Sequence, residues 1–225
     1  MLTTVLIDVD NTLLDFNECV KETIGVMFKR HNLENSEKVF PVFKEVNDML
    51  WLQIEAGELD RQGLYKVRWK MIFERLGIDK DGPSFENEFR LAFSESKQIV
   101  DGAYELLEYL SGKYTVCAAS NASAWQQNKR LRNTDMMKYL SHLFISEELG
   151  APKPKKEFFD KCLERLGNIP KEEVVLIGDS LSADINGGVA YGIKTIWFNY
   201  DKAPVTDDIR ADIIVDSLDE IKKYI

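Results

Sequence analysis

Six short apolar runs recur along the chain, and polar or turn-forming residues follow them. They cover residues 5–7, 114–119, 143–145, 174–177, 195–198 and 213–215. Most are continuously apolar rather than alternating, which is typical of strands buried on both faces of a parallel sheet. Helical stretches lie between the later runs, at residues 103–110, 124–132, 156–166 and 182–191. This alternation predicts an α/β fold with right-handed crossovers.

The segment from about residue 15 to residue 99 breaks this alternation. Its apolar residues recur at helical spacing, as Val20, Ile24 and Phe28 illustrate, and it contains no clear strand. Turn signals divide it at Gly57, Gly63, Gly77 and the 81–83 turn. We therefore predict an all-helical domain of residues 15–99, inserted into a discontinuous core domain of residues 1–14 and 100–225. A length of 225 residues suits one core with an inserted lobe.

Composition narrows the class of partner. The net charge of −9 disfavours binding to a nucleic-acid polymer. A small phosphorylated metabolite could still bind if lysines and a metal ion make the electrostatic potential positive at the site. No apolar run approaches the roughly 20 residues that span a bilayer, and no signal-peptide pattern is present, so we expect a cytoplasmic protein without a membrane partner. The scattered Cys19, Cys117 and Cys162 predict reduced thiols.

Four polar clusters each follow a predicted strand. They are residues 8–12, Ser120 with Asn121, Lys153, and Asp179 with Asp184. Taken singly, such residues are often turns, helix caps or a solvated lysine. Because ligands of an open parallel sheet bind beyond the carboxyl ends of its strands, the four together predict one convergent site.

The residue types in these clusters suit phosphate chemistry. In extended chain Asp8 and Asp10 would face the same side, so that one could act as nucleophile or metal ligand while the other exchanges a proton. Ser120 and Asn121, before a helix, suit phosphate oxygens. Lys153, between two prolines, could neutralise a transferring phosphoryl group. Asp179 together with Asp8 could hold magnesium.

With these motifs in this order, the chain resembles the haloacid dehalogenase superfamily of phosphohydrolases along its whole length. Residues 8–13 are similar to the first motif, Asp-x-Asp-x-Thr, and the three later clusters are similar to the other motifs. The resemblance implies a Rossmann-like core with a helical cap domain. It also implies phosphate-ester hydrolysis, since the dehalogenating members lack an aspartate at the position of Asp10.

The resemblance further implies a role for each residue. Asp8 would form an aspartyl-phosphate, and Asp10 would protonate the leaving group and then activate water. Mg²⁺ would bind the Asp8 carboxylate, the Asp10 carbonyl and Asp179. Ser120, Asn121 and Lys153 would position the phosphoryl group, and Asp184 would orient Lys153 or a metal-bound water.

Residues 47–57 and 192–199, with Arg61, Arg68 and Trp69, resemble the bacterial pyrimidine 5'-nucleotidase branch. This implies a nucleoside 5'-monophosphate substrate, with Trp51 stacking on the base and Arg68 reaching a polar edge; the alternative for the tryptophans is packing within the cap. Alternative substrates are phosphoglycolate or a sugar phosphate, and the alternatives to phosphatase activity are a phosphomutase reaction or a non-catalytic role. The protein could be a monomer or a homodimer. Two departures from the family pattern are Ala122, where glycine is common, and Pro152.

Overall fold

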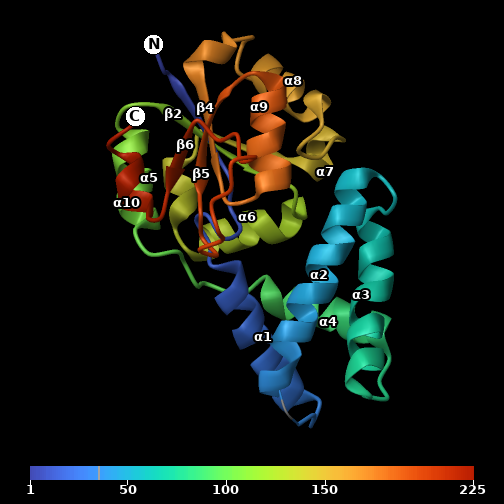
Figure 1. Cartoon of the computed structure of the whole chain (residues 1–225). Helices are drawn as coiled ribbons and strands as arrows, with labels where there is room; N and C mark the ends of the chain where they lie inside the picture. Colours follow the sequence, from blue (N-terminus) through green and yellow to red (C-terminus); the bar gives the residue numbers. More distant parts are fainter. Residues whose placement is uncertain (35) are drawn as a thin grey trace. The chain divides into compact units, whose positions relative to one another are not determined.

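A six-stranded, fully parallel sheet lies at the centre of the larger part of the protein, as the computed structural model shows (Figure 1). The structure describes residues 1–34 and 36–225, and these divide into two compact units, Met1–Phe16 with Lys97–Ile225 and Asn17–Ser96. The sheet order is β3-β2-β1-β4-β5-β6. The strands are β1 (Thr4–Ile7), β2 (Thr115–Ser120), β3 (His142–Ile145), β4 (Val174–Gly178), β5 (Lys194–Phe198) and β6 (Ile213–Val215).

Helices cover both faces of this sheet. The helices of this unit are α5 (Ala103–Ser111), α6 (Ala124–Asn133), α7 (Ser146–Leu149), α8 (Lys156–Arg165), α9 (Gly187–Tyr191) and α10 (Leu218–Ile221), with the short turns η2 (Met136–Tyr139) and η3 (Lys171–Glu173). Val5 and Ile7 pack in one core cluster with residues of α5, α6 and α10, whereas Leu6 packs in the other with residues of α8. Both faces of β1 are thus buried, which confirms the prediction from its unbroken apolar run.

The segment that follows β4 differs in detail from the predicted helix of residues 182–191. Its first part is the π-helix η4 (Leu181–Asn186), and only then does α9 begin. The carbonyl oxygen of Ser180 accepts hydrogen bonds from the backbone N–H groups of both Asp184 and Ile185, which widens this turn.

The smaller unit is entirely helical within the described residues, as the predicted fold class requires. It contains α1 (Phe16–Arg30), the turn η1 (Ser36–Lys38), α2 (Val39–Ala56), α3 (Arg61–Leu76) and α4 (Gly82–Phe93). Gly57 and Gly77 end α2 and α3 in the left-handed conformation, as turn signals should, but Gly63 lies inside the first turn of α3. The Asp60 carboxylate caps that turn by accepting a hydrogen bond from the Gly63 N–H group.

The core of the helical unit is aromatic. Trp69 is completely buried, and its ring contacts the rings of Phe28, Phe43, Phe73, Phe85 and Phe89. Aromatic contacts of this density fix the packing of four helices around one side chain. Of the two roles considered for this tryptophan, packing within the helical unit is therefore the one that the structure supports.

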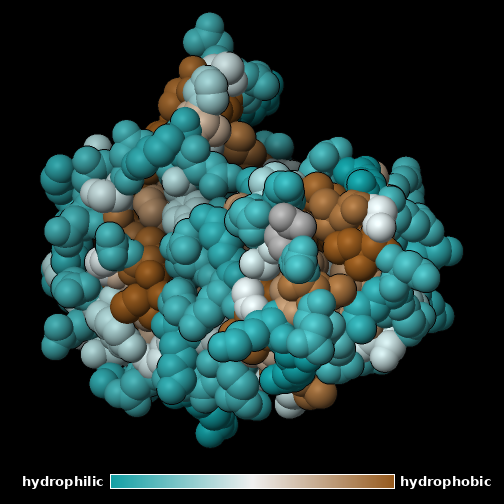
Figure 2. All heavy atoms as spheres, turned by 90° about the horizontal axis from the view of Figure 1, so that it is seen from below, coloured by the Kyte–Doolittle hydropathy of each residue, from teal (hydrophilic) through white to brown (hydrophobic). Residues whose placement is uncertain are grey.

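The surface is predominantly polar in the view of Figure 2, where hydrophobic residues form separate small groups. None of the helices in the described residues combines the length and hydrophobicity that crossing a membrane would require. Cys19, Cys117 and Cys162 are buried free thiols, as predicted.

Candidate active site

The strand order changes direction next to β1, and this point brings two of the predicted aspartates together. The chain proceeds from β1 to β2 and β3 on one side, and from β4 to β5 and β6 on the other. Ile7 and Ile177 are register partners, and the Asp8 N–H group donates to the Ile177 carbonyl oxygen over 2.8 Å. Asp8 and Asp179 therefore leave neighbouring strands at the same edge, where open α/β sheets bind ligands.

Lys153 is the buried cation of the site. Its side chain is 2% exposed, and its Nζ donates to Asp8 Oδ1 over 2.7 Å and to Asp184 Oδ1 over 2.6 Å. The Ala119 carbonyl oxygen, in β2, accepts its third hydrogen bond over 2.6 Å. Burial alone would lower the pKa of this ammonium, but the carboxylates of Asp184 and Asp8 outweigh burial and raise it. Lys153 thus stays charged, as its predicted role requires.

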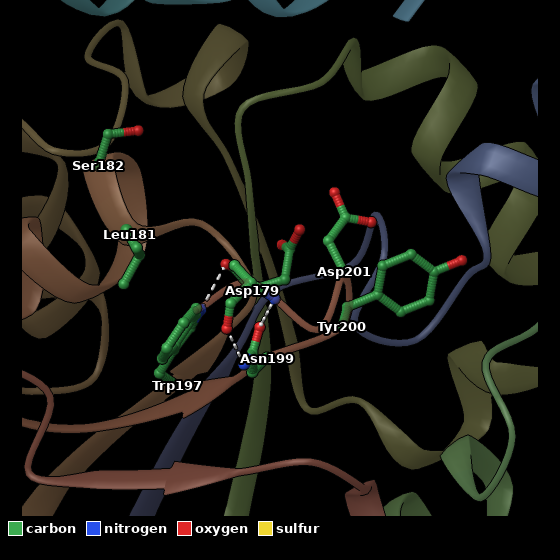
Figure 3. A pocket seen from close by; sticks show the side chains of 8 residues that line it. Asp179, Leu181, Ser182, Trp197, Asn199, Tyr200 and Asp201 are labelled. Carbon is green, nitrogen blue, oxygen red and sulfur yellow. Dashed lines mark hydrogen bonds between the residues drawn. The ribbon is translucent and has the colours of Figure 1, made fainter. Parts of the chain in front are cut away.

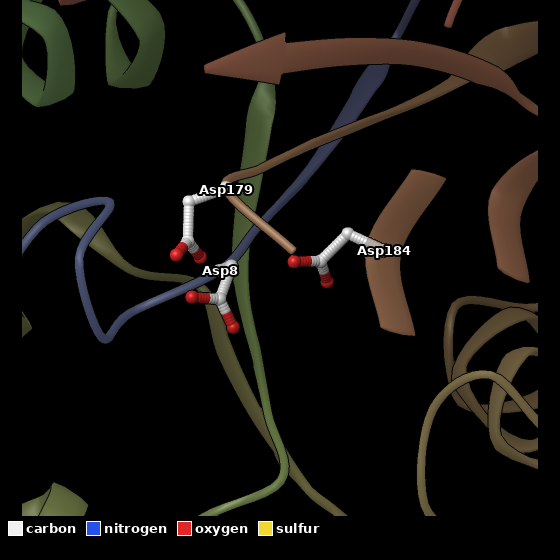
Figure 4. A group of neighbouring side chains, drawn as sticks. All are labelled: Asp8, Asp179 and Asp184. Carbon is white, nitrogen blue, oxygen red and sulfur yellow. The ribbon is translucent and has the colours of Figure 1, made fainter. Parts of the chain in front are cut away.

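Three carboxylates surround this one ammonium. Asp8, Asp179 and Asp184 each place an oxygen within 4.8 Å of the others, and Figure 4 shows the three side chains directed toward a common region. Burial is the main cause that raises the pKa of Asp8 to about 7, with the Asp184 carboxylate adding to it and Lys153 opposing it. Burial, Asp8 and Asp184 raise the pKa of Asp179 well above its ordinary value.

This excess of negative charge fits a divalent cation. When all four groups are ionised, three negative charges face one positive charge, which leaves a net charge of −2 on the cluster. Carboxylate oxygens are the ligands that magnesium prefers, and magnesium usually binds through only one or two carboxylates plus water and phosphate. Asp184 already bonds Lys153 and the Ser180 N–H group, so Asp8 and Asp179 are the carboxylates left to hold the ion.

Ser120 and Asn121, the second cluster, have different hydrogen-bond partners. Ser120 ends β2 and is 2% exposed, and its Oγ accepts a hydrogen bond from the Ala122 N–H group over 3.1 Å. The Asn121 amide instead holds the backbone of Lys153: Nδ2 donates to its carbonyl oxygen and Oδ1 accepts from its N–H group, both over 2.9 Å. The geometry therefore argues against phosphate binding by the Asn121 side chain, which positions Lys153. Ala122 does not have a positive φ. Alanine at this position, where the family commonly has glycine, therefore causes no backbone strain.

Asp10 forms an isolated β-bridge with Leu14, and a tight turn follows it. Asn11 has a φ of 58°, a left-handed conformation that asparagine tolerates well, and the Val9 carbonyl oxygen accepts bonds from the N–H groups of residues 12–14. The Asp10 carboxylate then meets two side chains of α6. Arg130 Nη1 donates to Oδ1 over 2.5 Å, and Gln127 Nε2 donates to Oδ2 over 2.7 Å. Neither Gln127 nor Arg130 is among the site residues predicted from the sequence.

Gly178, the last residue of β4, makes room for Asp184. A Cβ atom at this position would overlap the Asp184 carboxylate. We expect Gly178→Ala to displace Asp184 and, with it, Lys153, and to lower kcat/KM for the predicted phosphate-ester substrates at least about tenfold, since misplacing reacting groups by about 1 Å can cost on the order of 100-fold. Steady-state kinetics with circular dichroism as a folding check would test this. Gly112→Ala, where a Cβ meets only ordinary van der Waals contacts, is the control, and equal activity of the two variants would refute the steric argument.

Comparison with known proteins shows the family of this chain. The family model of haloacid dehalogenase-like hydrolases matches residues 2–192. The chain belongs to this family. It is 31% identical to the HAD-hydrolase YfnB of Bacillus subtilis over 97% of this chain and 93% of that protein. It is 32% identical to the pyrimidine 5'-nucleotidase PynA of Streptococcus pneumoniae, covering 87% of this chain and 83% of PynA. The pyrimidine 5'-nucleotidase YjjG of Escherichia coli is 30% identical, covering 98% and 96%.

A crystal structure of this haloacid dehalogenase-like family has nearly the same fold. YfnB bound to magnesium aligns with a TM-score of 0.92 at 30% identity, over 99% of this chain and 98% of YfnB. The predicted α/β fold with a helical insertion, and the predicted membership of the superfamily, are thereby confirmed. That a relative of this similarity binds magnesium agrees with the acidic cluster described above.

Arg68 and Trp51, the two predicted substrate contacts of the helical unit, differ in burial. Arg68 is 7% exposed, and its guanidinium group bonds both oxygens of the buried Glu86 carboxylate, over 3.1 and 2.6 Å, and Asn47 Oδ1 over 2.9 Å. These bonds commit Arg68 to holding α2, α3 and α4 together, so the geometry argues against its predicted contact with substrate. Trp51 remains partly exposed on α2, and its stacking role stays a prediction.

An open cavity of about 290 Å³ adjoins Asp179 in the hydrolase core. Trp197, Tyr200 and Asn199 line it, as Figure 3 shows. The Trp197 indole N–H group donates to the Asp179 carbonyl oxygen over 2.8 Å and so fixes the backbone of that aspartate. Trp197 lies in the segment of residues 192–199 that resembles the nucleotidase branch, and nothing in the local sequence indicates this contact.

Proposed function

We propose that this protein is a magnesium-dependent phosphatase that hydrolyses a small phosphate monoester through an aspartyl-phosphate on Asp8. The observation that carries the proposal is the carboxylate of Asp8, which is 11% exposed at its side chain, bonded to the Lys153 ammonium, and beside Asp179 and Asp184. A nucleophile must be reachable and must be held close to the charges that stabilise the transferred group. Asp8 meets both conditions.

The reaction has two steps. A free oxygen of Asp8 attacks phosphorus, the bond between phosphorus and the leaving oxygen breaks, and its electron pair stays on that oxygen, which takes a proton from Asp10. In the second step Asp10 takes a proton from water, the resulting hydroxide oxygen bonds to phosphorus, and the Asp8 carboxylate is released together with inorganic phosphate. Proton transfer by a positioned carboxyl group typically contributes on the order of 10²–10⁴-fold to the rate.

Electrostatic stabilisation accompanies both steps, because phosphoryl transfer leaves the protein little covalent chemistry beyond positioning. The Lys153 ammonium faces the charge that develops on the phosphoryl oxygens, and the Ser120 hydroxyl can donate to one of them. Magnesium bound by Asp8, the Asp10 carbonyl oxygen and Asp179 would add positive charge at the same place.

We further propose a nucleoside 5'-monophosphate with a pyrimidine base as the substrate. Two relatives of about 30% identity, PynA and YjjG, are named as pyrimidine 5'-nucleotidases, and both align over at least 83% of their length. The partner is then a small phosphorylated metabolite, with no need for a polymer.

A panel of phosphate esters tests this proposal. We expect phosphate release from dUMP, dTMP and UMP to exceed release from purine nucleotides and sugar phosphates, and to stop when EDTA removes magnesium. Phosphate is measured directly, since a phosphomutase would retain it on the product. A sugar phosphate turned over faster than every nucleotide would show that the substrate assignment is wrong, while metal-independent turnover would contradict the role given to Asp179.

A further inference from the structure

Both oxygens of the Asp10 carboxylate are held by one face of α6. Gln127 and Arg130 lie three residues apart, so their side chains point to the same side of the helix. Gln127 is fully buried and Arg130 is 1% exposed, whereas the Asp10 side chain is 26% exposed. The two partners therefore lie in the interior, and the part of Asp10 that remains open is available to a ligand.

The same two side chains also bond each other and Ser120. Arg130 Nη1 donates to Gln127 Oε1 over 3.1 Å, which fixes the orientation of the Gln127 amide. Gln127 Nε2 then donates to both Asp10 Oδ2 over 2.7 Å and Ser120 Oγ over 3.0 Å. One buried amide thus joins the acid-base candidate to the hydroxyl that is expected to meet the phosphate.

We propose that Gln127 and Arg130 are positioning residues that hold Asp10 where it can exchange a proton with the leaving oxygen. This inference rests on the proposed phosphatase function. A carboxylate has about four lone pairs, and each Asp10 oxygen uses one of them here, so a lone pair remains for the transferred proton. Charge-assisted bonds of this kind are short and directional. Without them the Asp10 side chain would sample other rotamers, and a displacement of about 1 Å can cost on the order of 100-fold in rate.

The dependence of the rate on the leaving group separates this role from a merely structural one. The alkoxide released from a nucleotide or another alkyl phosphate needs a proton, whereas the p-nitrophenolate ion released from p-nitrophenyl phosphate is stable without one. The value of kcat/KM covers the steps up to the release of the leaving group. Both substrates are measured on one preparation, so their ratio does not depend on how much of a variant is folded.

We expect Arg130→Met and Gln127→Met to lower kcat/KM for dUMP about 10- to 100-fold more than for p-nitrophenyl phosphate, within the range that general acid catalysis contributes. Arg130→Lys should show a smaller shift, because the charge remains but the rigid guanidinium fork is lost. Asp10→Asn should shift the ratio in the same direction. Adding Arg130→Met to Asp10→Asn should shift it no further, since both changes then act through one group.

Arg132→Met is the matched control, because Arg132 lies on the same helix but is exposed. It should leave the ratio unchanged. If the Arg130 and Gln127 variants lose activity equally on both esters, or lose none, the positioning role is overturned while the phosphatase function stands. If the unmodified protein hydrolyses neither ester, the proposed function fails, and this inference fails with it.

Discussion

Replacing Asp8 with asparagine is expected to lower kcat for phosphate monoesters by about 10⁴-fold or more, the order of loss seen when a catalytic nucleophile is removed. Asparagine is nearly isosteric with aspartate, but its amide cannot form the acyl phosphate. The fold should survive. Burial is the main cause that raises the pKa of Asp8 to about 7, and the Asp184 carboxylate adds to it, so the replacement removes a carboxylate that is costly to ionise there.

Two measurements on the Asp8→Asn variant check this expectation. Phosphate release with saturating dUMP and magnesium gives kcat, and thermal unfolding in EDTA should give a midpoint no lower than that of the unmodified protein. Asp101→Asn, at an exposed position of the same unit, serves as the control and should keep full activity. An Asp8→Asn variant with near-normal turnover would move the nucleophile to another residue, and a strongly lowered midpoint would mean that the fold needs this carboxylate.

The sheet and the convergence of its polar clusters could be predicted because they follow from local rules. The unbroken apolar run of residues 5–7 requires burial on both faces, and a parallel sheet follows from the helices between the strands. In such a sheet the residues after each strand gather at one edge. The contact of Lys153 with Asp8, 145 positions apart in the chain, is a consequence of that topology.

The partners of individual side chains could not be predicted in the same way. Arg68 pairs with Glu86 only because α3 and α4 pack together, and nothing in their local sequence distinguishes a buried arginine from one that meets a ligand. Gln127 and Arg130 resemble ordinary polar positions of an amphipathic helix until burial is known. Their spacing of three residues, directly after the second cluster, was the one signal available, and a weak one.

Replacing Lys153 with methionine should cause the largest loss of stability among the substitutions proposed. Methionine fills a similar volume but leaves the buried carboxylates of Asp8 and Asp184 without their ammonium, and breaking a buried pair in this way costs roughly 3–5 kcal/mol. For a chain of this size that corresponds to a fall of about 10 °C in the unfolding midpoint. Phosphatase activity should be lost as well, because the charge facing the phosphoryl group is removed.

The pH dependence of this loss identifies its cause. Lys153 opposes the rise in the pKa of Asp8, so the substitution should raise that pKa further above about 7. A carboxyl group whose pKa is higher in the folded than in the unfolded state stabilises the fold when protonated, and this contribution falls as pH rises toward the folded-state pKa. Below pH 7 Asp8 is protonated in both proteins, whereas above pH 7 it must ionise at greater cost in the variant. Urea unfolding in EDTA should therefore show a gap between the two proteins that widens from pH 6 to pH 8.5. Lys155→Met, at an exposed position two residues away, should show almost no gap at either pH. A gap of the same size at both pH values would mean that the charge of Lys153 does not stabilise the ionised Asp8 carboxylate.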